Sequence, residues 1–100
     1  MILFDDIKGL SVLSNRHRKT SKAIFATPTR SNVPWVEIEN LLGALGAEVT
    51  EGRGSRVRVR LRGVRAVFHR PHPRKEAVQG SVRSVRRFLT TAGVTIQDGE

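Results

Sequence analysis

Arginine and valine alternate between residues 56 and 61, and this alternation constrains the fold more than any other feature of the sequence. In the segment RVRVRL, Val57, Val59 and Leu61 occupy the odd positions and arginine occupies the even ones. Successive side chains of a β-strand point to opposite faces of a sheet. We therefore expect a strand with one face buried in a core and the other face covered with arginine.

The residues that follow predict a partner for this strand. Arg62-Gly63 is typical of a two-residue hairpin loop, because glycine tolerates the positive φ that such loops require. The hairpin places apolar pairs on the core face: Leu61 with Val64, Val59 with Ala66, and Val57 with Phe68. On the other face the expected pairs are Arg60 with Arg65, Arg58 with Val67, and Arg56 with His69. Two arginines opposite each other cost stability, and a bridging anion would relieve that cost.

Helices are expected on both sides of this hairpin. From Pro34 the apolar residues follow a helical period, and Gly46 is a natural end for that helix. The apolar stripe consists of Trp35, Ile38, Leu41, Leu42 and Leu45. An aromatic residue on such a stripe usually packs in the core, so we favour a core position for Trp35 over a role in stacking on bases. Residues 47–50 are expected to form the first strand.

A second helix is predicted near the end of the chain, with Ser81 as its N-cap and Gly93 as its end. Its inner stripe would consist of Val82, Val85, Phe88, Leu89 and Ala92. Its outer side would carry Arg83, Arg86 and Arg87. Earlier in the chain, residues 19–26 are compatible with a short helix that Pro28 stops.

Together these elements predict an α+β domain in the order α-β-β-β-α. Two helices would cover one face of a three-stranded antiparallel sheet, and the opposite face would stay open and carry the arginines. Residues 19–96 would form this domain. Residues 1–18 show no sustained period and are expected to be an N-terminal arm outside it.

The charge of the chain points to a polyanionic partner. The 100 residues carry 18 Lys and Arg against 9 Asp and Glu, a net charge of +9. The excess is concentrated in residues 52–87. This segment contains twelve basic residues, eleven of them arginine, and one acidic residue, Glu76. Arginine binds phosphate through a planar fork, and a clustered basic field is typical of nucleic-acid binding. We expect RNA contacts from Arg56, Arg58, Arg60, Arg65 and Arg70.

Other classes of protein fit the sequence less well. It has no cysteine, no apolar run of the length that a membrane span needs, and acidic residues where a signal peptide would be basic. We therefore expect no disulfide, no membrane partner and a cytoplasmic location. A metal-dependent nuclease needs several carboxylates, which residues 52–87 lack, so no metal site and no cofactor are expected.

RNA can be cleaved without metal when a base activates its own 2′-OH and cations stabilise the charge that develops. Histidine suits the acid and base roles near neutral pH. His69 and His72 lie within the arginine-rich segment and are the candidate catalytic residues. The alternative is that His69 is an ordinary surface residue and that His72 only hydrogen-bonds within a turn.

Residues 34–93 resemble the HicA family of small bacterial toxins. The resemblance is carried by the opening helix through LLGALGAEV, the turn Gly54-Ser55, the element Pro71-His72-Pro73, and QGSVRSVRRFLTTAGV at 79–94. It implies a fold like the double-stranded-RNA-binding domain. It also implies a metal-independent endoribonuclease that cleaves messenger RNA, and a HicB-like antitoxin that neutralises it by covering the basic face.

One position departs from the family pattern. Members usually carry the catalytic histidine directly after the glycine-serine turn, where this chain has Arg56. Either the activity is lost or another histidine serves, and His69 would lie across from Arg56. The hypotheses are therefore a HicA-like toxin ribonuclease, a non-catalytic RNA-binding module of the same fold, and a DNA-binding or ribosome-associated protein.

Overall fold

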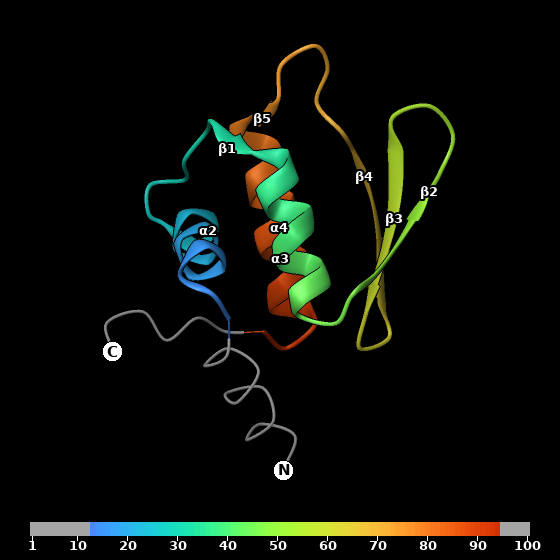
Figure 1. Cartoon of the computed structure of the whole chain (residues 1–100), viewed down its shortest axis with the longest axis horizontal. Coiled ribbons are helices and arrows are strands. Elements are labelled where there is room, and N and C mark those ends of the chain that lie inside the picture. The colour runs from blue at the N-terminus through green and yellow to red at the C-terminus, as the bar shows by residue number, and fades with distance from the viewer. Residues whose placement is uncertain (1–12, 95–100) are drawn as a thin grey trace.

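The computed structural model describes residues 13–94 and has three layers (Figure 1). Helix α2 (Asn15–Phe25) forms one outer layer, helices α3 (Trp35–Ala44) and α4 (Gln79–Thr91) form the middle, and a sheet forms the other outer layer. The sheet contains β2 (Glu48–Glu51), β3 (Arg56–Leu61) and β4 (Val64–His69), antiparallel and in that order. The run from α3 through the sheet to α4 confirms the predicted α+β class and the α-β-β-β-α order.

The hairpin between β3 and β4 has the register predicted from the sequence. All six expected pairs are present, from Arg56 opposite His69 to Leu61 opposite Val64. The loop residues Arg62 and Gly63 have φ values of 52° and 83°, as a two-residue loop with positive φ at both positions requires. Because the register of a strand determines which side chains face the core, the face assignments are also confirmed.

The core lies on both sides of α3 and α4: one part faces the sheet, and Leu13 and Ile24 extend it toward α2. Val57 and Val59 of β3 are 0% and 2% exposed, and the predicted inner stripe of α4 is buried along its whole length. Trp35 is buried and packs edge-to-face on Phe68, with ring centroids 5.9 Å apart. Phe68 in turn packs on Phe88 at 5.7 Å. Trp35 is therefore a core residue, as expected.

The start of α4 corrects one prediction. The helix begins at Gln79 after Val78, and Ser81 lies inside its first turn instead of capping it. The cause is a small second sheet that the sequence did not indicate: β5 (Glu76–Ala77) pairs with β1 (Val33–Pro34) directly before α4. The hydrogen bond from Val82 N to Val78 O then begins the helix.

Arg86 corrects a second prediction, because it is half-buried and does not lie on an outer surface of α4. Its guanidinium donates to the carbonyl oxygens of Ile24 and Ala26, each at 3.0 Å. These carbonyls lie at the end of α2, which packs on this side of α4. Arg86 therefore satisfies backbone oxygens that the helix itself leaves without a partner.

Helix α2 begins at Asn15, four residues before the start expected from the sequence. The Ser14 hydroxyl accepts a hydrogen bond from His17 N at 3.2 Å and caps the helix. Leu13 is buried, and Ile24 near the other end of the helix is completely buried. The N-terminal arm expected upstream falls largely on residues 1–12, which lie outside the described residues, as do residues 95–100.

Candidate nucleic-acid interface

The face of the sheet turned away from the helices carries the charged side chains of three adjacent strands. Strand pairing arranges them in rows across the sheet. One row contains Glu48, Arg60 and Arg65, the next contains Thr50, Arg58 and Val67, and the last ends with Arg56 and His69. All of these side chains are exposed.

The end of the sheet that holds His69 also holds the glycine-serine turn. Arg70 N donates to Ser55 O at 2.9 Å, so the turn lies against the residue that follows β4. Arg56, the next residue after the turn, is the backbone partner of His69. The structure thus brings an imidazole and a guanidinium together on the open face.

The arginines of this face differ in their partners. Arg60 forms an ion pair with Glu48 of the neighbouring strand, and both side chains are more than half exposed. Within residues 13–94, no hydrogen bond or ion pair joins Arg56, Arg58 or Arg65 to another side chain. These three guanidinium groups are therefore available to bind an external anion.

Arg70 has a different environment from the other four predicted RNA contacts. Its Nε donates to Glu39 of α3 at 2.7 Å, and its Nη1 donates to Glu51 of β2 at 2.7 Å. The hydrogen bond from Arg70 lowers the pKa of the Glu51 carboxyl, and the two carboxylates together raise the pKa of Arg70. Glu39 also accepts a hydrogen bond from the Trp35 indole. Arg70 therefore links α3, β4 and β2 at the end of the sheet where His69 lies.

A shallow hollow of about 510 Å³ lies over the middle of the open face. Its lining includes Arg58, Arg60 and Arg65, and Val67, which is 54% exposed, lies beside them. Glu48 also lines the hollow and pairs with Arg60, so Arg58 and Arg65 are the guanidinium groups available to bind phosphate there, while Val67 can contact a sugar or base. This arrangement suits a nucleic-acid backbone better than a small apolar ligand.

The predicted catalytic histidines occupy different places. His69 lies on the open face at the end of β4, and His72 lies three residues further, exposed in the loop that leads to β5. Arg56 and His69 are brought together by pairing, whereas His72 belongs to no sheet row. Across residues 13–94 no three His, Cys, Asp or Glu side chains gather in a way that could hold a metal ion.

Sequence reasoning missed the acidic partners of the basic residues. Glu39 and Glu51 are 12 positions apart and 31 and 19 positions from Arg70, so nothing in local spacing indicates that they meet. One sequence feature indicated such pairing. Residues 33–51 contain four glutamates and no basic residue, and they directly precede the basic segment. Opposite charges in adjacent segments favour pairing once the elements pack.

Comparison with known proteins gives a match to a family model. A family model described as HicA toxin of bacterial toxin-antitoxin matches residues 35–94. No curated protein and no solved structure matches the chain. Among the residues that the structure describes, no helix is long and apolar enough to cross a membrane.

Proposed function

The chain belongs to the HicA toxin family, whose model matches more than half of it, and from this premise we propose that it is an RNA-cleaving toxin. Its substrate would be messenger RNA, bound on the open face of the sheet and cleaved without metal. The observation that supports this most strongly is that His69 lies opposite Arg56 at one end of a face where Arg56, Arg58 and Arg65 have no side-chain partner within residues 13–94. A base and an anion-binding group are the minimum that cleavage by the 2′-OH requires.

In the proposed reaction His69 takes the proton of a ribose 2′-OH. The resulting oxygen attacks the adjacent phosphorus, and the bond from phosphorus to the 5′-oxygen breaks. The products are a 2′,3′-cyclic phosphate and a 5′-hydroxyl, after the leaving oxygen gains a proton. Arg56 and Arg58 would stabilise the negative charge that builds on the phosphate oxygens.

His72 is the candidate for the acid that protonates the leaving oxygen. Its exposed position in the loop after β4 leaves its side chain accessible to RNA that extends past the end of the sheet. Water can replace a histidine in this role, so His72 is the less essential of the two. The loss of cleavage rate should therefore be larger when His69 is replaced than when His72 is replaced.

The second candidate function is an RNA-binding module without catalysis. Arg56 favours it, because the family usually has its catalytic histidine at this position and arginine does not lose its proton in proteins. Such a module would use the same arginines to hold RNA by its backbone. It would still be a target for an antitoxin that covers the basic face.

Cleavage of a single-stranded RNA in the presence of EDTA separates the two functions. We expect the parent protein to cleave and His69→Ala to cleave about 10² to 10⁴ times more slowly, which is the usual contribution of an acid–base group. RNA affinity should change little. His72→Ala should match that loss only if both histidines transfer protons.

Two results would decide against the ribonuclease. Full activity in a variant that lacks both histidines would exclude the histidine mechanism. No cleavage by the parent protein, together with tight RNA binding, would favour the binding module. Circular dichroism of each variant would verify that the fold is retained.

The partner and the location follow from the same proposal. A HicB-like antitoxin would neutralise the toxin in the cytoplasm by covering Arg56, Arg58 and Arg65. Because these side chains have no internal partner within residues 13–94, an acidic antitoxin surface would compete directly with RNA for them.

A further inference from the structure

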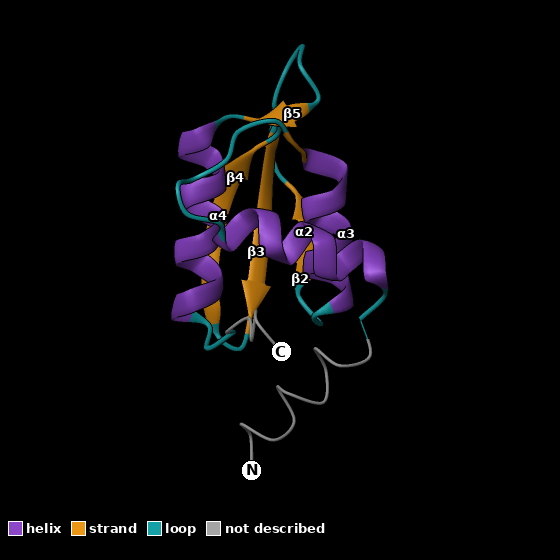
Figure 2. Cartoon of the chain, turned by 90° about the vertical axis from the view of Figure 1, so that its left-hand side faces the viewer, coloured by secondary structure: helices purple, strands orange, loops and turns teal. Residues whose placement is uncertain are grey.

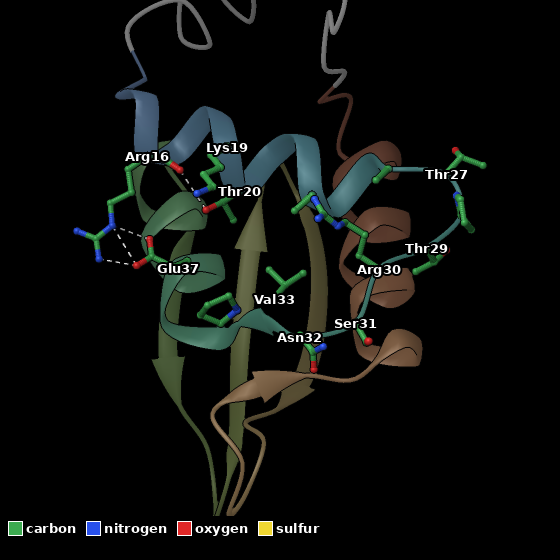
Figure 3. Close-up of a pocket in the computed structure, with 14 residues that line it drawn as sticks. Arg16, Lys19, Thr20, Thr27, Thr29, Arg30, Ser31, Asn32, Val33 and Glu37 are labelled. Atoms are coloured by element: carbon green, nitrogen blue, oxygen red, sulfur yellow. Dashed lines mark hydrogen bonds and ion pairs between the residues drawn. The ribbon is translucent and has the colours of Figure 1, made fainter.

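A larger groove lies on the side of α3 and α4 opposite the sheet, between α2 and the segment that joins α2 to α3 (Figure 3). Its volume is about 950 Å³. All but one of the residues that line it lie between positions 16 and 34, before the residues that match the family model; the exception is Glu37. Figure 2 views the molecule from this side, with α2 crossing in front of the other helices. The groove is therefore distinct from the face proposed to bind RNA.

Residues 26–32 form one wall of the groove, and hydrogen bonds with α4 and β5 fix this wall. Arg86 Nη2 donates to Thr29 Oγ1 at 3.0 Å in addition to its bonds with α2. Gln79 donates to Thr29 O at 2.8 Å, and Asn32 N donates to Ala77 O at 3.0 Å. These contacts fix the segment before any ligand arrives, so binding would cost little additional ordering of the wall.

Two cations of the groove have no partner among the residues that the structure describes. Arg16 is neutralised by Glu37, to which its Nε donates at 2.8 Å. Lys19 of α2 and Arg30 of the opposite wall are exposed and form no ion pair within residues 13–94. In Figure 3 the Arg30 side chain points from the wall toward α2, where Lys19 lies. Two cations on opposite walls suit an anionic segment that lies between them.

The rest of the lining favours a peptide over a nucleic acid. Small apolar residues contribute much of it: Ala23, Ala26, Pro28, Val33 and Pro34. The lining also includes the carboxylate of Glu37, which pairs with Arg16, so the groove offers a phosphate backbone fewer available cations than the sheet face does. Apolar surface between two cations is complementary to a segment that alternates acidic and apolar residues.

We propose that this groove binds an extended acidic and apolar peptide segment of a protein partner. Carboxylates of the segment contact Lys19 and Arg30, and its apolar side chains contact the small residues between them. The site lies on the far side of the helices from the arginine face, so a partner can occupy it while RNA or another protein occupies the sheet. The proposal does not depend on catalysis.

The test uses a fluorescein-labelled peptide of twelve residues that alternates glutamate and valine, titrated with the whole protein. We expect binding that Lys19→Glu with Arg30→Glu weakens about ten-fold or more, because both cations then repel the segment. The matched control is Arg58→Glu with Arg65→Glu. It changes the net charge of the protein by the same amount as the groove variant, but on the sheet face. It should leave peptide affinity within about two-fold. A milder pair, Lys19→Ala with Arg30→Ala, should give a smaller loss in the same direction.

Three outcomes would overturn the proposal. One is peptide affinity that falls equally in the two charge-reversed variants, because attraction would then be general. Another is a peptide of alternating glutamate and glycine that binds as tightly as the valine peptide, since the apolar lining would then contribute nothing. The third is a twelve-nucleotide uridine RNA that loses affinity in the groove variant while the peptide does not.

Discussion

The two faces of strand β3 differ in both burial and charge. Val57, Val59 and Leu61 are at most 4% exposed, whereas Arg56, Arg58 and Arg60 are exposed along the same six residues. The apolar face makes the contacts that keep the domain folded. The arginine face is exposed and includes Arg60 opposite Arg65, a like-charge pair in which Arg60 also forms an ion pair with Glu48. Residues one position apart on β3 therefore serve separate purposes, so their substitution should have separable effects.

The largest effect is expected on the buried face. Val59→Asp would place a carboxylate at a position that is 2% exposed, and the buried residues of the segment 13–94 include no cation to pair with it. Burying an unpaired charge costs more than the few kcal/mol of stability typical of a small domain. The variant should therefore be unfolded at 25 °C by circular dichroism. A folded Val59→Asp protein would mean that the two faces are not as different as their burial indicates.

The next effect is expected on RNA affinity and not on stability. Arg58→Ala should weaken binding of single-stranded RNA and reduce the slope of log affinity against log salt by about 1, because one phosphate contact is lost. The melting temperature should hardly change, since surface substitutions usually alter stability by about 0.5 kcal/mol or less. Fluorescence anisotropy at several salt concentrations gives both the affinity and the slope. An unchanged slope would show that Arg58 contacts no phosphate.

Substitution of Arg65 is expected to raise the stability of the fold slightly, whereas Val59→Asp lowers it. Arg65→Thr removes one member of the like-charge pair with Arg60 and introduces a residue that suits a strand. We expect the free energy of unfolding to rise by about 0.2 to 1 kcal/mol, while RNA affinity falls. Urea denaturation of the variant beside the parent measures the first effect. A loss of stability would indicate that Arg65 makes a stabilising contact.

The smallest effect is expected from pH and concerns arginines that have acidic partners. Hydrogen bonds from Arg16 and Arg70 lower the pKa of Glu37 and Glu51 below the ordinary value of 4.5. A lowered pKa contributes stability that is present above the ordinary value and is lost as pH falls through the lowered one. Melting temperature should therefore stay level from pH 7 to about pH 5 and fall below about pH 4.

Two variants sharpen that measurement. Arg70→Met removes the partner of Glu51 and should make the decrease at low pH shallower. Arg58→Met is the control, because Arg58 pairs with no carboxylate in the described part of the chain. Equal pH profiles for the two variants would contradict the role assigned to Arg70.

Local patterns predicted the hairpin and its faces, because strict alternation and a glycine loop determine register without help from distant residues. The same holds for Trp35 and the inner stripe of α4. The start of α4 could not be predicted this way, since it depends on β5 pairing with β1 more than 40 positions earlier. The hydrogen bonds from Arg86 to α2 and from Arg70 to two glutamates could not be predicted for the same reason, because they join residues far apart in the sequence. A basic residue in the sequence does not show whether it will bind a ligand or a carboxylate of its own chain.

The proposed RNA interface is tested most directly by observing which arginines RNA contacts. The side-chain Nε–Hε signals of ¹⁵N-labelled protein can be followed by NMR during titration with a 2′-O-methyl RNA, which binds but cannot be cleaved through its 2′-oxygen. We expect the signals of Arg56, Arg58 and Arg65 to shift together and the signal of Arg83 on α4 to stay unchanged. Shifts confined to Arg83 and to arginines on the α2 side of the molecule, with the sheet arginines unchanged, would exclude the sheet face as the RNA site.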